Sequence, residues 1–287
     1  MRPLPPRLRS AASHVKPDSA DPVFHNLTSL FRYRGLIQSL VARELKARYR
    51  GSVLGFFWSF INPLLLLLVY TFVFSVVLPN RSPRTQPYAI FLFSGILPWT
   101  WFSSSLLESS NVLIAGGNLI KKVLFPAEVL PIVTVLANMV HFLFGLPILV
   151  VFLVAFDKIP DPAGLGWFPV ALAVQFVLTL GFALIFAALT VHFRDIKDIL
   201  GNLMTFWFFS TPIIYDMAEF DGKPWAQTLL NLNPFTHLAI TYQEILFYDG
   251  PVGHWKWLLV LGACAVGLFL LGYFLFDRLR DSFAEEV

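Results

Sequence analysis

Hydrophobic residues recur along this chain in six long stretches separated by shorter polar segments. The stretches cover residues 53–78, 88–107, 129–156, 167–193, 199–215 and 256–276. A helix needs about 20 consecutive apolar residues to cross a bilayer core. None of the six carries Lys or Arg in its interior, and a soluble chain rarely offers even one such run. The pattern therefore predicts an all-α integral membrane protein with six transmembrane helices.

The segment before the first stretch, residues 29–50, has the pattern of an amphipathic helix that lies in the membrane interface. Its apolar face carries Leu30, Tyr33, Ile37, Leu40, Val41 and Leu45, and Arg43, Lys46 and Arg50 lie opposite. Glu44 and Arg48 fall within the apolar face, where they either pair with each other or contact a protein partner. Residues 1–28 have five prolines and no apolar run, so we expect a disordered cytoplasmic tail.

A few polar residues interrupt the predicted spans. Ser104, Glu108 and Asn111 share one helical face in the second span. Because a carboxylate at membrane depth is costly, Glu108 either faces protein or a water-filled cavity, or marks the cytoplasmic end of the helix. We expect Asn138, His141 and Gln175 to form hydrogen bonds between helices. Pro63 is expected to kink the first span, and Pro212 the fifth near its end.

The polar segment 216–255 is predicted to fold on the outer side between the fifth and sixth spans. Pro224 can start a short helix that ends at Leu232, and Asn233-Pro234 reads as an N-cap followed by proline at the first helical position. These outer helices, within residues 216–250, form either an ordinary folded loop or a gate over the spans.

Composition and charge agree with a membrane protein. Apolar residues make up 56% of the 287 positions and charged residues 14%, against about 25% charged in soluble domains. These values exclude a disordered chain and a collagen-like fibre, and the single Cys264 excludes a disulfide scaffold. Sixteen of the 21 Lys and Arg residues fall on one side of the six-span topology. This asymmetry places both termini in the cytoplasm.

The chain lacks the motifs of a motor or an enzyme. No phosphate-binding loop of the G-x-x-x-x-G-K-[ST] type occurs, and neither does a hydrolase or a metal-ligand motif. The acid pairs Asp157 with Asp161 and Asp216 with Glu219 lie in short turns, where solvated loop charge is the expected role. We therefore expect no catalytic residue, metal site or cofactor in this chain.

Four stretches, in order, carry a family resemblance. They run from Arg43-Glu44-Leu45 to Asn62-Pro63, from Gly95 to Phe102, from Asn118 to Pro131, and from Phe193-Arg194-Asp195 through Thr211-Pro212 to Asn233-Pro234. The chain thereby resembles the permeases of ABC transporters that export polysaccharides, among them the O-antigen and teichoic-acid exporters. The resemblance covers about residues 30–280, with one departure at Ala127, where a basic residue is expected.

The resemblance implies a homodimer of six-span permeases in the bacterial inner membrane, with two ATP-binding-cassette ATPase subunits bound beneath. ATP and Mg²⁺ are then expected only in the partner ATPase, and no nucleic acid is involved. The first and fifth spans would line a channel, for which the candidate aromatic residues are Phe56, Phe60, Tyr70, Phe206, Phe209 and Tyr215. Candidates for coupling to the ATPase are Arg43, Glu44, Arg48, Asn118, Leu119, Lys121, Lys122, Phe125, Arg194 and Asp195. The outer gate would include Asn233, Pro234 and Phe235.

The expected function is export of a lipid-linked polysaccharide to the outer side of the membrane. Aromatic side chains suit this task, because their faces accept the C–H face of a sugar without requiring one hydroxyl pattern. Helix packing or interfacial belts are the alternative role for each ring. The alternative functions are an ABC exporter of drugs or small lipids, a membrane glycosyltransferase acting on a lipid-linked sugar, and a structural scaffold.

Overall fold

The computed structural model describes residues 33–77, 82–117 and 126–286. Every regular element in these ranges is helical, which confirms the predicted all-α class. The chain divides into two compact units, Met1–Gly35 and Leu36–Val287. All contacts reported below lie within the second unit.

Five helical segments are long and apolar enough to cross a membrane. The first comprises the 3₁₀ turn η1 (Gly55–Phe57) and α3 (Trp58–Phe72), and the others contain α4 (Tyr88–Ala115), α6 (Val129–Ala155), α8 (Phe168–His192) and α12 (Trp255–Glu286). A π-helical turn, η2 (Val73–Val77), extends α3, and the short η3 (Pro83–Thr85) precedes α4. These segments match the first, second, third, fourth and sixth predicted spans.

The fifth predicted span, residues 199–215, differs in the structure. Its helix, α9, runs from Ile196 to Phe209, and its 14 residues are about 21 Å long at 1.5 Å per residue. The helix ends early because Pro212 disfavours helical backbone at Thr211. In addition, the Asn233 side-chain amide donates hydrogen bonds to the Ser210 carbonyl and the Thr211 hydroxyl, at 3.0 and 2.8 Å. Pro212 thus lies beyond the helix end and kinks no helix.

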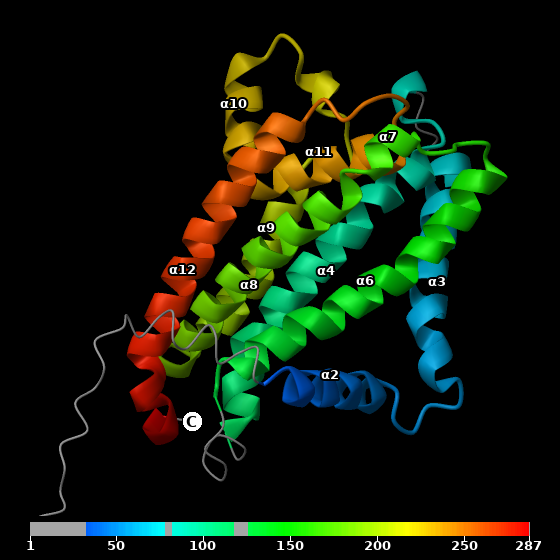
Figure 1. The fold of residues 1–287 in the computed structure, drawn as a ribbon. Helices are drawn as coiled ribbons and strands as arrows, with labels where there is room; N and C mark the ends of the chain where they lie inside the picture. The colour runs from blue at the N-terminus through cyan, green and yellow to red at the C-terminus, as the bar shows by residue number, and fades with distance from the viewer. Residues whose placement is uncertain (1–32, 78–81, 118–125, 287) are drawn as a thin grey trace, which may run out of the picture. The chain divides into compact units, whose positions relative to one another are not determined.

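Helix α4 forms the centre of the bundle (Figure 1) and packs against α3, α6, α8, α9 and α11. Its fully buried aromatic residues include Phe91, Phe93, Trp101 and Phe102. Polar links tie it to two neighbours: the Trp101 indole donates to the Val135 carbonyl of α6 at 3.1 Å, and the Gln175 amide of α8 donates to the Pro98 carbonyl at 2.8 Å. The predicted interhelical role of Gln175 is confirmed.

Helices α8 and α12 meet at a seam of small residues. A Cβ atom on Gly272 would lie 2.6 Å from the Gly181 carbonyl oxygen, and one on Gly181 would lie 2.9 Å from the Phe269 backbone nitrogen. No side chain fits at such distances, so glycine at both positions lets the two backbones touch. Close approach through small residues is a recurrent way of packing helices in membranes.

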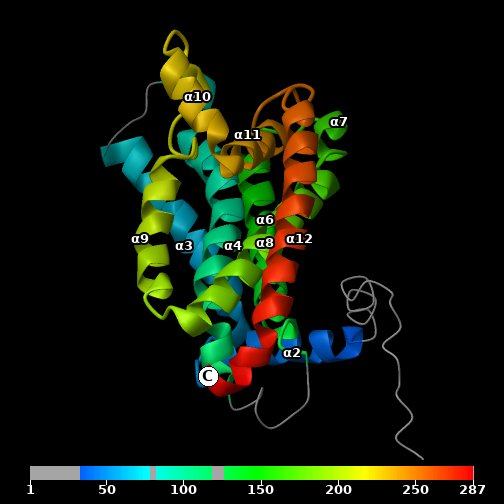
Figure 2. The ribbon, with the colours of Figure 1, turned by 90° about the vertical axis from the view of Figure 1, so that its left-hand side faces the viewer.

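Helix α2 (Arg34–Arg48) lies across one end of the bundle, where the α8–α9 turn and the C-terminal end of α12 also lie (Figures 1 and 2). Its apolar side chains Leu36, Ile37, Leu40 and Val41 pack on Val129 and Val133 of α6. The predicted amphipathic helix is therefore present. However, this part of its apolar face, which we expected to lie in the membrane interface, is covered by protein, because the first turn of α6 offers two β-branched residues beneath it.

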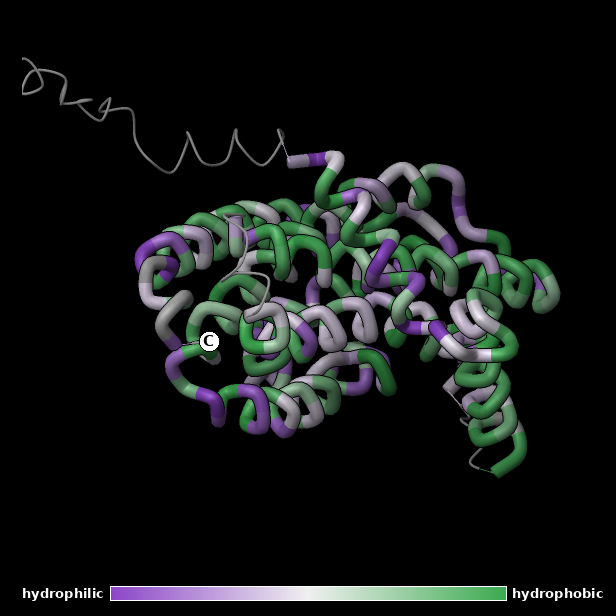
Figure 3. Tube along the Cα trace, turned by 90° about the horizontal axis from the view of Figure 1, so that it is seen from below, coloured by the Kyte–Doolittle hydropathy of each residue, from purple (hydrophilic) through white to green (hydrophobic). Residues whose placement is uncertain are grey.

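The opposite end carries α7 (Pro162–Leu165), the turn η4 (Met217–Phe220), α10 (Pro224–Leu232) and α11 (Pro234–Leu246). Helices α10 and α11 have the predicted start points, and the Asn233 carboxamide oxygen caps α11 by accepting from the Phe235 N–H at 2.9 Å. Seen from below, hydrophobic positions dominate the sides of the bundle (Figure 3).

Candidate functional site

Two helices, α3 and α9, pack loosely and expose apolar surface. Both contact α4, and they lie on the same side of the bundle (Figure 2). In α3 only Ser59 and Leu67 are buried, and in α9 only Leu200 and Met204. Five of the six predicted channel residues belong to these helices or to the turn η1. The helices therefore form a broad apolar wall, to which we give the name α3–α9 wall.

The predicted channel residues on the α3 side divide into two groups. Phe56, with 51% of its surface exposed, and Phe60 both pack on Phe144 of α6, at ring-centroid distances of 5.0 and 5.1 Å. Tyr70 instead turns inward, where it packs partly buried against the core and lies 6.4 Å from Phe74. Phe56 thus remains on the exposed wall, whereas Tyr70 contributes to helix packing.

On the α9 side, Phe206 and Phe209 are 71% and 59% exposed, the most open aromatic residues of that helix. Tyr215 lies beyond α9, where its hydroxyl donates to the Phe209 carbonyl at 3.2 Å and its ring packs on Phe220. Among the described residues no ring pair joins α3 to α9. A single chain therefore does not bring the two halves of the predicted channel wall together.

A polar network links α2, α4 and α6 next to this wall. The Arg48 guanidinium forms a hydrogen-bonded ion pair with the Glu108 carboxylate, which also accepts from the Asn138 amide at 2.8 Å. Arg48 lies 3.9 Å from Glu44 as well. Glu108 therefore faces protein, which is one of the two roles expected for it. Asn138 forms the expected interhelical bond, and Arg48 ties α2 to the bundle.

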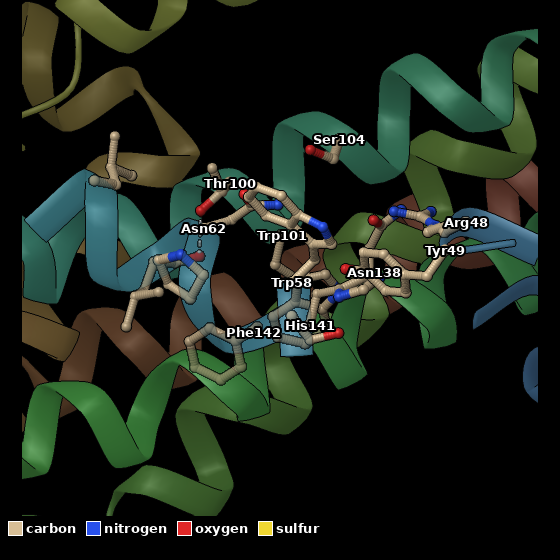
Figure 4. Close-up of a pocket in the computed structure, with 14 residues that line it drawn as sticks. Arg48, Tyr49, Trp58, Asn62, Thr100, Trp101, Ser104, Asn138, His141 and Phe142 are labelled. Atoms are coloured by element: carbon tan, nitrogen blue, oxygen red, sulfur yellow. Dashed lines mark hydrogen bonds between the residues drawn. The ribbon is translucent and has the colours of Figure 1, made fainter. Parts of the chain in front are cut away.

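A pocket of about 380 Å³ opens beside this network, between the end of α2 and helices α3, α4 and α6 (Figure 4). Its lining is both aromatic and polar: Tyr49, Trp58, Trp101 and Phe142 alternate with Asn62, Thr100, Ser104, Asn138 and His141. Sequence reasoning found Asn62, Ser104, Asn138 and His141 individually but did not join them, because they belong to three different helices.

Three of the candidate coupling residues are exposed at the α2 end of the bundle. Arg43 is exposed on α2, and Arg194 and Asp195 are exposed in the turn between α8 and α9. Glu44 and Arg48 take part in the ion pairs described above. The remaining candidates, Asn118, Leu119, Lys121, Lys122 and Phe125, lie outside the described residues.

Of the predicted gate residues, Phe235 lies inside the bundle, whereas Asn233 and Pro234 are half-buried. Phe235 is fully buried and packs on Trp99 and Phe102 of α4, at 5.0 and 4.8 Å between ring centroids. Asn233 joins α9 to α11, since its carboxamide oxygen also accepts from the Trp207 indole at 2.6 Å. The exposed part of the outer segment is α10, with Trp225, Leu229 and Leu232 on its open face.

Two polar clusters hold the outer segment in place, and sequence reasoning missed both. The Tyr248 hydroxyl donates to Asp216 at 3.1 Å, and Arg84 reaches the same carboxylate at 3.5 Å. Burial and the nearby charge of Asp216 raise the pKa of Tyr248. Separately, a ring nitrogen of His237 lies 2.9 Å from one of His254. Burial and the proximity of His237 lower the pKa of His254 to about 4, so both rings are neutral at pH 7.

The arrangement defines a multi-pass helical membrane protein whose polar residues link helices and line pockets. No group of three or more His, Cys, Asp or Glu residues that could bind a metal ion occurs within the described ranges. The family profile of the ABC-2 type transporters matches residues 35–247. The chain therefore belongs to this family of transport permeases, which are not enzymes.

Individual relatives give the same answer over greater lengths. The chain is 40% identical over 262 residues to the O-antigen export system permease protein RfbA of Myxococcus xanthus, covering 90% of this chain and 97% of that protein. A protein of the same name from Klebsiella pneumoniae is 32% identical over 91% of this chain and 97% of its own length. The polysialic acid transport protein KpsM of Escherichia coli is 24% identical over 72% of this chain and 80% of its own length.

Proposed function

We propose that this chain is the transmembrane permease subunit of an ATP-driven exporter that moves a lipid-linked polysaccharide of the O-antigen type across the bacterial inner membrane. The observation that carries the proposal is the 40% identity to an O-antigen export permease over nearly its whole length. The exposed aromatic residues Phe56, Phe206 and Phe209 support it, because their faces suit sliding contact with sugar rings.

The export pathway requires two copies of the chain. The α3–α9 wall exposes far more apolar surface than packing within one chain covers, and its two aromatic halves do not meet. A second copy facing this wall would complete a channel with four aromatic edges. Helix α9 together with Ser210–Tyr215 then makes the fifth of six crossings, because the polypeptide beyond α9 is buried in protein rather than in lipid.

ATP hydrolysis belongs to a partner subunit, since this chain has no phosphate-binding loop. The α2 end would face the cytoplasm and the ATPase, which fits the exposed cations Arg43 and Arg194 there. A push on α2 would reach α4 through Arg48 and Glu108 and α6 through Asn138. The outer helices α10 and α11 would form the exit gate, with α10 as the movable part because it is the more exposed.

Copurification from the native host tests this proposal. A tagged, full-length permease extracted in mild detergent should bring down an ATPase with a phosphate-binding loop in equal stoichiometry. Deleting the permease should abolish polysaccharide at the cell surface and leave lipid-linked glycan inside the cell. Repeated absence of an ATPase, or normal surface polysaccharide in the deletion strain, would contradict the proposal.

A further inference from the structure

The pocket between α2, α3, α4 and α6 contains polar side chains at membrane depth, where contact with lipid tails would be costly. Asn62 lies in the first spanning segment and Thr100 in the second, and both are exposed. In the part of the chain that the structure describes, the Asn62 side chain makes no hydrogen bond, and Figure 4 shows it at the pocket beside Thr100. Polar groups at membrane depth face water or a polar ligand, because contact with lipid tails is costly.

Two buried atoms of the pocket also lack a hydrogen-bond partner. Ser59 is 3% exposed, and its hydroxyl oxygen bonds to no described residue. The Nε2 atom of His141 is in the same situation. Furthermore, Pro63 has no N–H with which to bond the Ser59 carbonyl. Native proteins satisfy nearly all buried polar groups, so these atoms mark the wall of the pocket as unusually polar. The group directly open to an occupant is the exposed Asn62 carboxamide, which both donates and accepts hydrogen bonds.

The aromatic walls of the pocket are held rigidly. The Trp58 indole N–H donates to the Ser52 hydroxyl at 2.9 Å, and the Trp101 indole N–H is used by Val135 of α6. The Trp101 ring stacks on Phe142, with 5.4 Å between centroids and 28° between planes. Trp101 is only 2% exposed and forms the back of the pocket, whereas Trp58 is half-buried and offers an apolar face to the occupant, because its indole N–H bonds elsewhere.

The positive charge at the pocket is already neutralised by carboxylates. Arg48 is the one cation among the lining residues, and its guanidinium is paired with Glu108 and lies near Glu44. An anionic group such as a phosphate would have to compete with these carboxylates. An uncharged occupant avoids this cost, and hydroxyl groups meet the need for both donors and acceptors.

We propose that the pocket is a binding subsite for an uncharged sugar ring, stacked on Trp58 and hydrogen-bonded by Asn62. The volume of about 380 Å³ lies at the lower end of the range for small-ligand sites. The inference rests on the proposed polysaccharide export and deepens it: the substrate meets a built site beside the cytoplasmic end of α3. The sugar belongs either to the glycan chain or to the sugar attached to its lipid carrier.

Equilibrium binding to the full-length permease in phospholipid nanodiscs tests the subsite. The probe is tritiated octyl β-glucoside below its micellar concentration, and the competitor of equal chain length is octyl phosphocholine. We expect saturable binding at one site per chain. Asn62→Leu should weaken it roughly tenfold, which is the loss of one well-made hydrogen bond. Trp58→Ala, which removes the stacking face, should weaken it as well. Thr71→Val is the matched control, since the Thr71 hydroxyl bonds to Leu67 in the same helix outside the pocket.

Each outcome decides the proposal. Equal displacement by octyl phosphocholine, or wild-type affinity in the Asn62→Leu and Trp58→Ala variants with unchanged thermal midpoints, would overturn it. Displacement by free maltotriose would assign the site to the glycan chain, and displacement by alkyl glycosides alone would assign it to the lipid-linked sugar. The measurement needs no ATPase. If the wild-type chain copurifies with an ATPase but shows no saturable binding, the subsite is refuted and the proposed function remains intact.

Discussion

The α8–α12 seam and the α3–α9 wall differ more than any other two regions of the bundle. At the seam, Gly181 and Gly272 let two helix backbones touch. On the wall, α3 and α9 bury two residues each and leave large apolar side chains such as Val69, Phe72 and Phe206 open. Both regions are rich in apolar residues, so the contrast lies in how tightly their helices pack.

The difference indicates that the two regions have different roles, one in stability and one in contacts with other molecules. Helix α4 packs along α6 and α8, and α8 packs along α12. We call these four helices the rigid side, because closely packed helices cannot slide without losing many contacts. Helices α3 and α9 have few such contacts to lose, so their surface is available for a second copy, for substrate and for movement. The structural variants below test this contrast, beginning with the one that should cost the most stability.

Gly272→Val should disrupt the seam. The new side chain would meet the Gly181 carbonyl oxygen, which is backbone and cannot rotate away, so we expect a loss of about 3 kcal/mol or more. Thermal unfolding of the full-length chain in nanodiscs measures it. Gly267→Val is the matched control on the same helix, since a Cβ atom there meets nothing within 4 Å. Similar stability of the two variants would mean that α8 and α12 are not tightly packed.

Asn233→Ala should weaken the connection between α9, which belongs to the α3–α9 wall, and α11. The side chain caps α11, accepts from Trp207 and donates to Ser210 and Thr211. Loss of the cap costs about 1 kcal/mol, and the groups left unpaired bring the expected total to about 2 kcal/mol. Asn202→Ala, which removes one exposed bond within α9, should change the thermal midpoint little. Equal shifts in both variants would contradict a structural connection at Asn233.

The sequence predicted the fold well wherever a signal lies within one helix. Apolar runs located five spanning segments, and the caps at Pro224 and Asn233 placed the starts of α10 and α11. The prediction of the end of α9 was wrong, because the Asn233 side chain that bonds the Ser210 carbonyl and the Thr211 hydroxyl is 22 residues or more away along the chain.

The candidate site was less accessible from sequence, because its parts come together only through packing. Nothing local assigns Glu108 to Arg48, 60 residues earlier, or joins Asn62 with His141 in one pocket. Likewise, the pattern that predicted Phe235 in a helix could not tell that the residue would be buried beneath Trp99. The channel role stays a prediction for all six candidates: Phe56, Phe60, Tyr70, Phe206, Phe209 and Tyr215.

A pH-sensitive pair of histidines lies at the end of the bundle opposite α2. Ring nitrogens of His254 and His237 are 2.9 Å apart there. Because burial lowers the pKa of His254 from 6.5 to about 4, the unfolded chain binds more protons than the folded one between these values. Stability should therefore fall as the pH is lowered from 6.5 towards 4, and His254→Gln should reduce this fall.

Thermal midpoints at pH 7.5 and 5.0 test the role of the histidine pair. Burial raises the pKa of Glu244, which has the opposite effect on stability, but Glu244 keeps its bond to the residue-254 backbone N–H in the variant. The difference between wild type and His254→Gln thus isolates the histidine pair. His192→Gln changes an exposed histidine at the other end and should retain the wild-type pH dependence. Identical pH dependence in all three proteins would show that the histidine pair does not cause the loss of stability at low pH.

Phe206→Ala and Phe209→Ala should change stability least and transport most. Each side chain is more than half exposed, so its removal should shift the free energy of unfolding by less than about 0.5 kcal/mol. If the wall contacts the glycan, surface polysaccharide should nevertheless fall several-fold at normal permease levels. Phe274→Ala is the matched control, because Phe274 is 53% exposed on α12, which belongs to the rigid side. A fall in export with Phe274→Ala as large as with Phe209→Ala would show that any exposed phenylalanine matters equally. Only a selective loss on α9 ties the open packing of the wall to the passage of substrate.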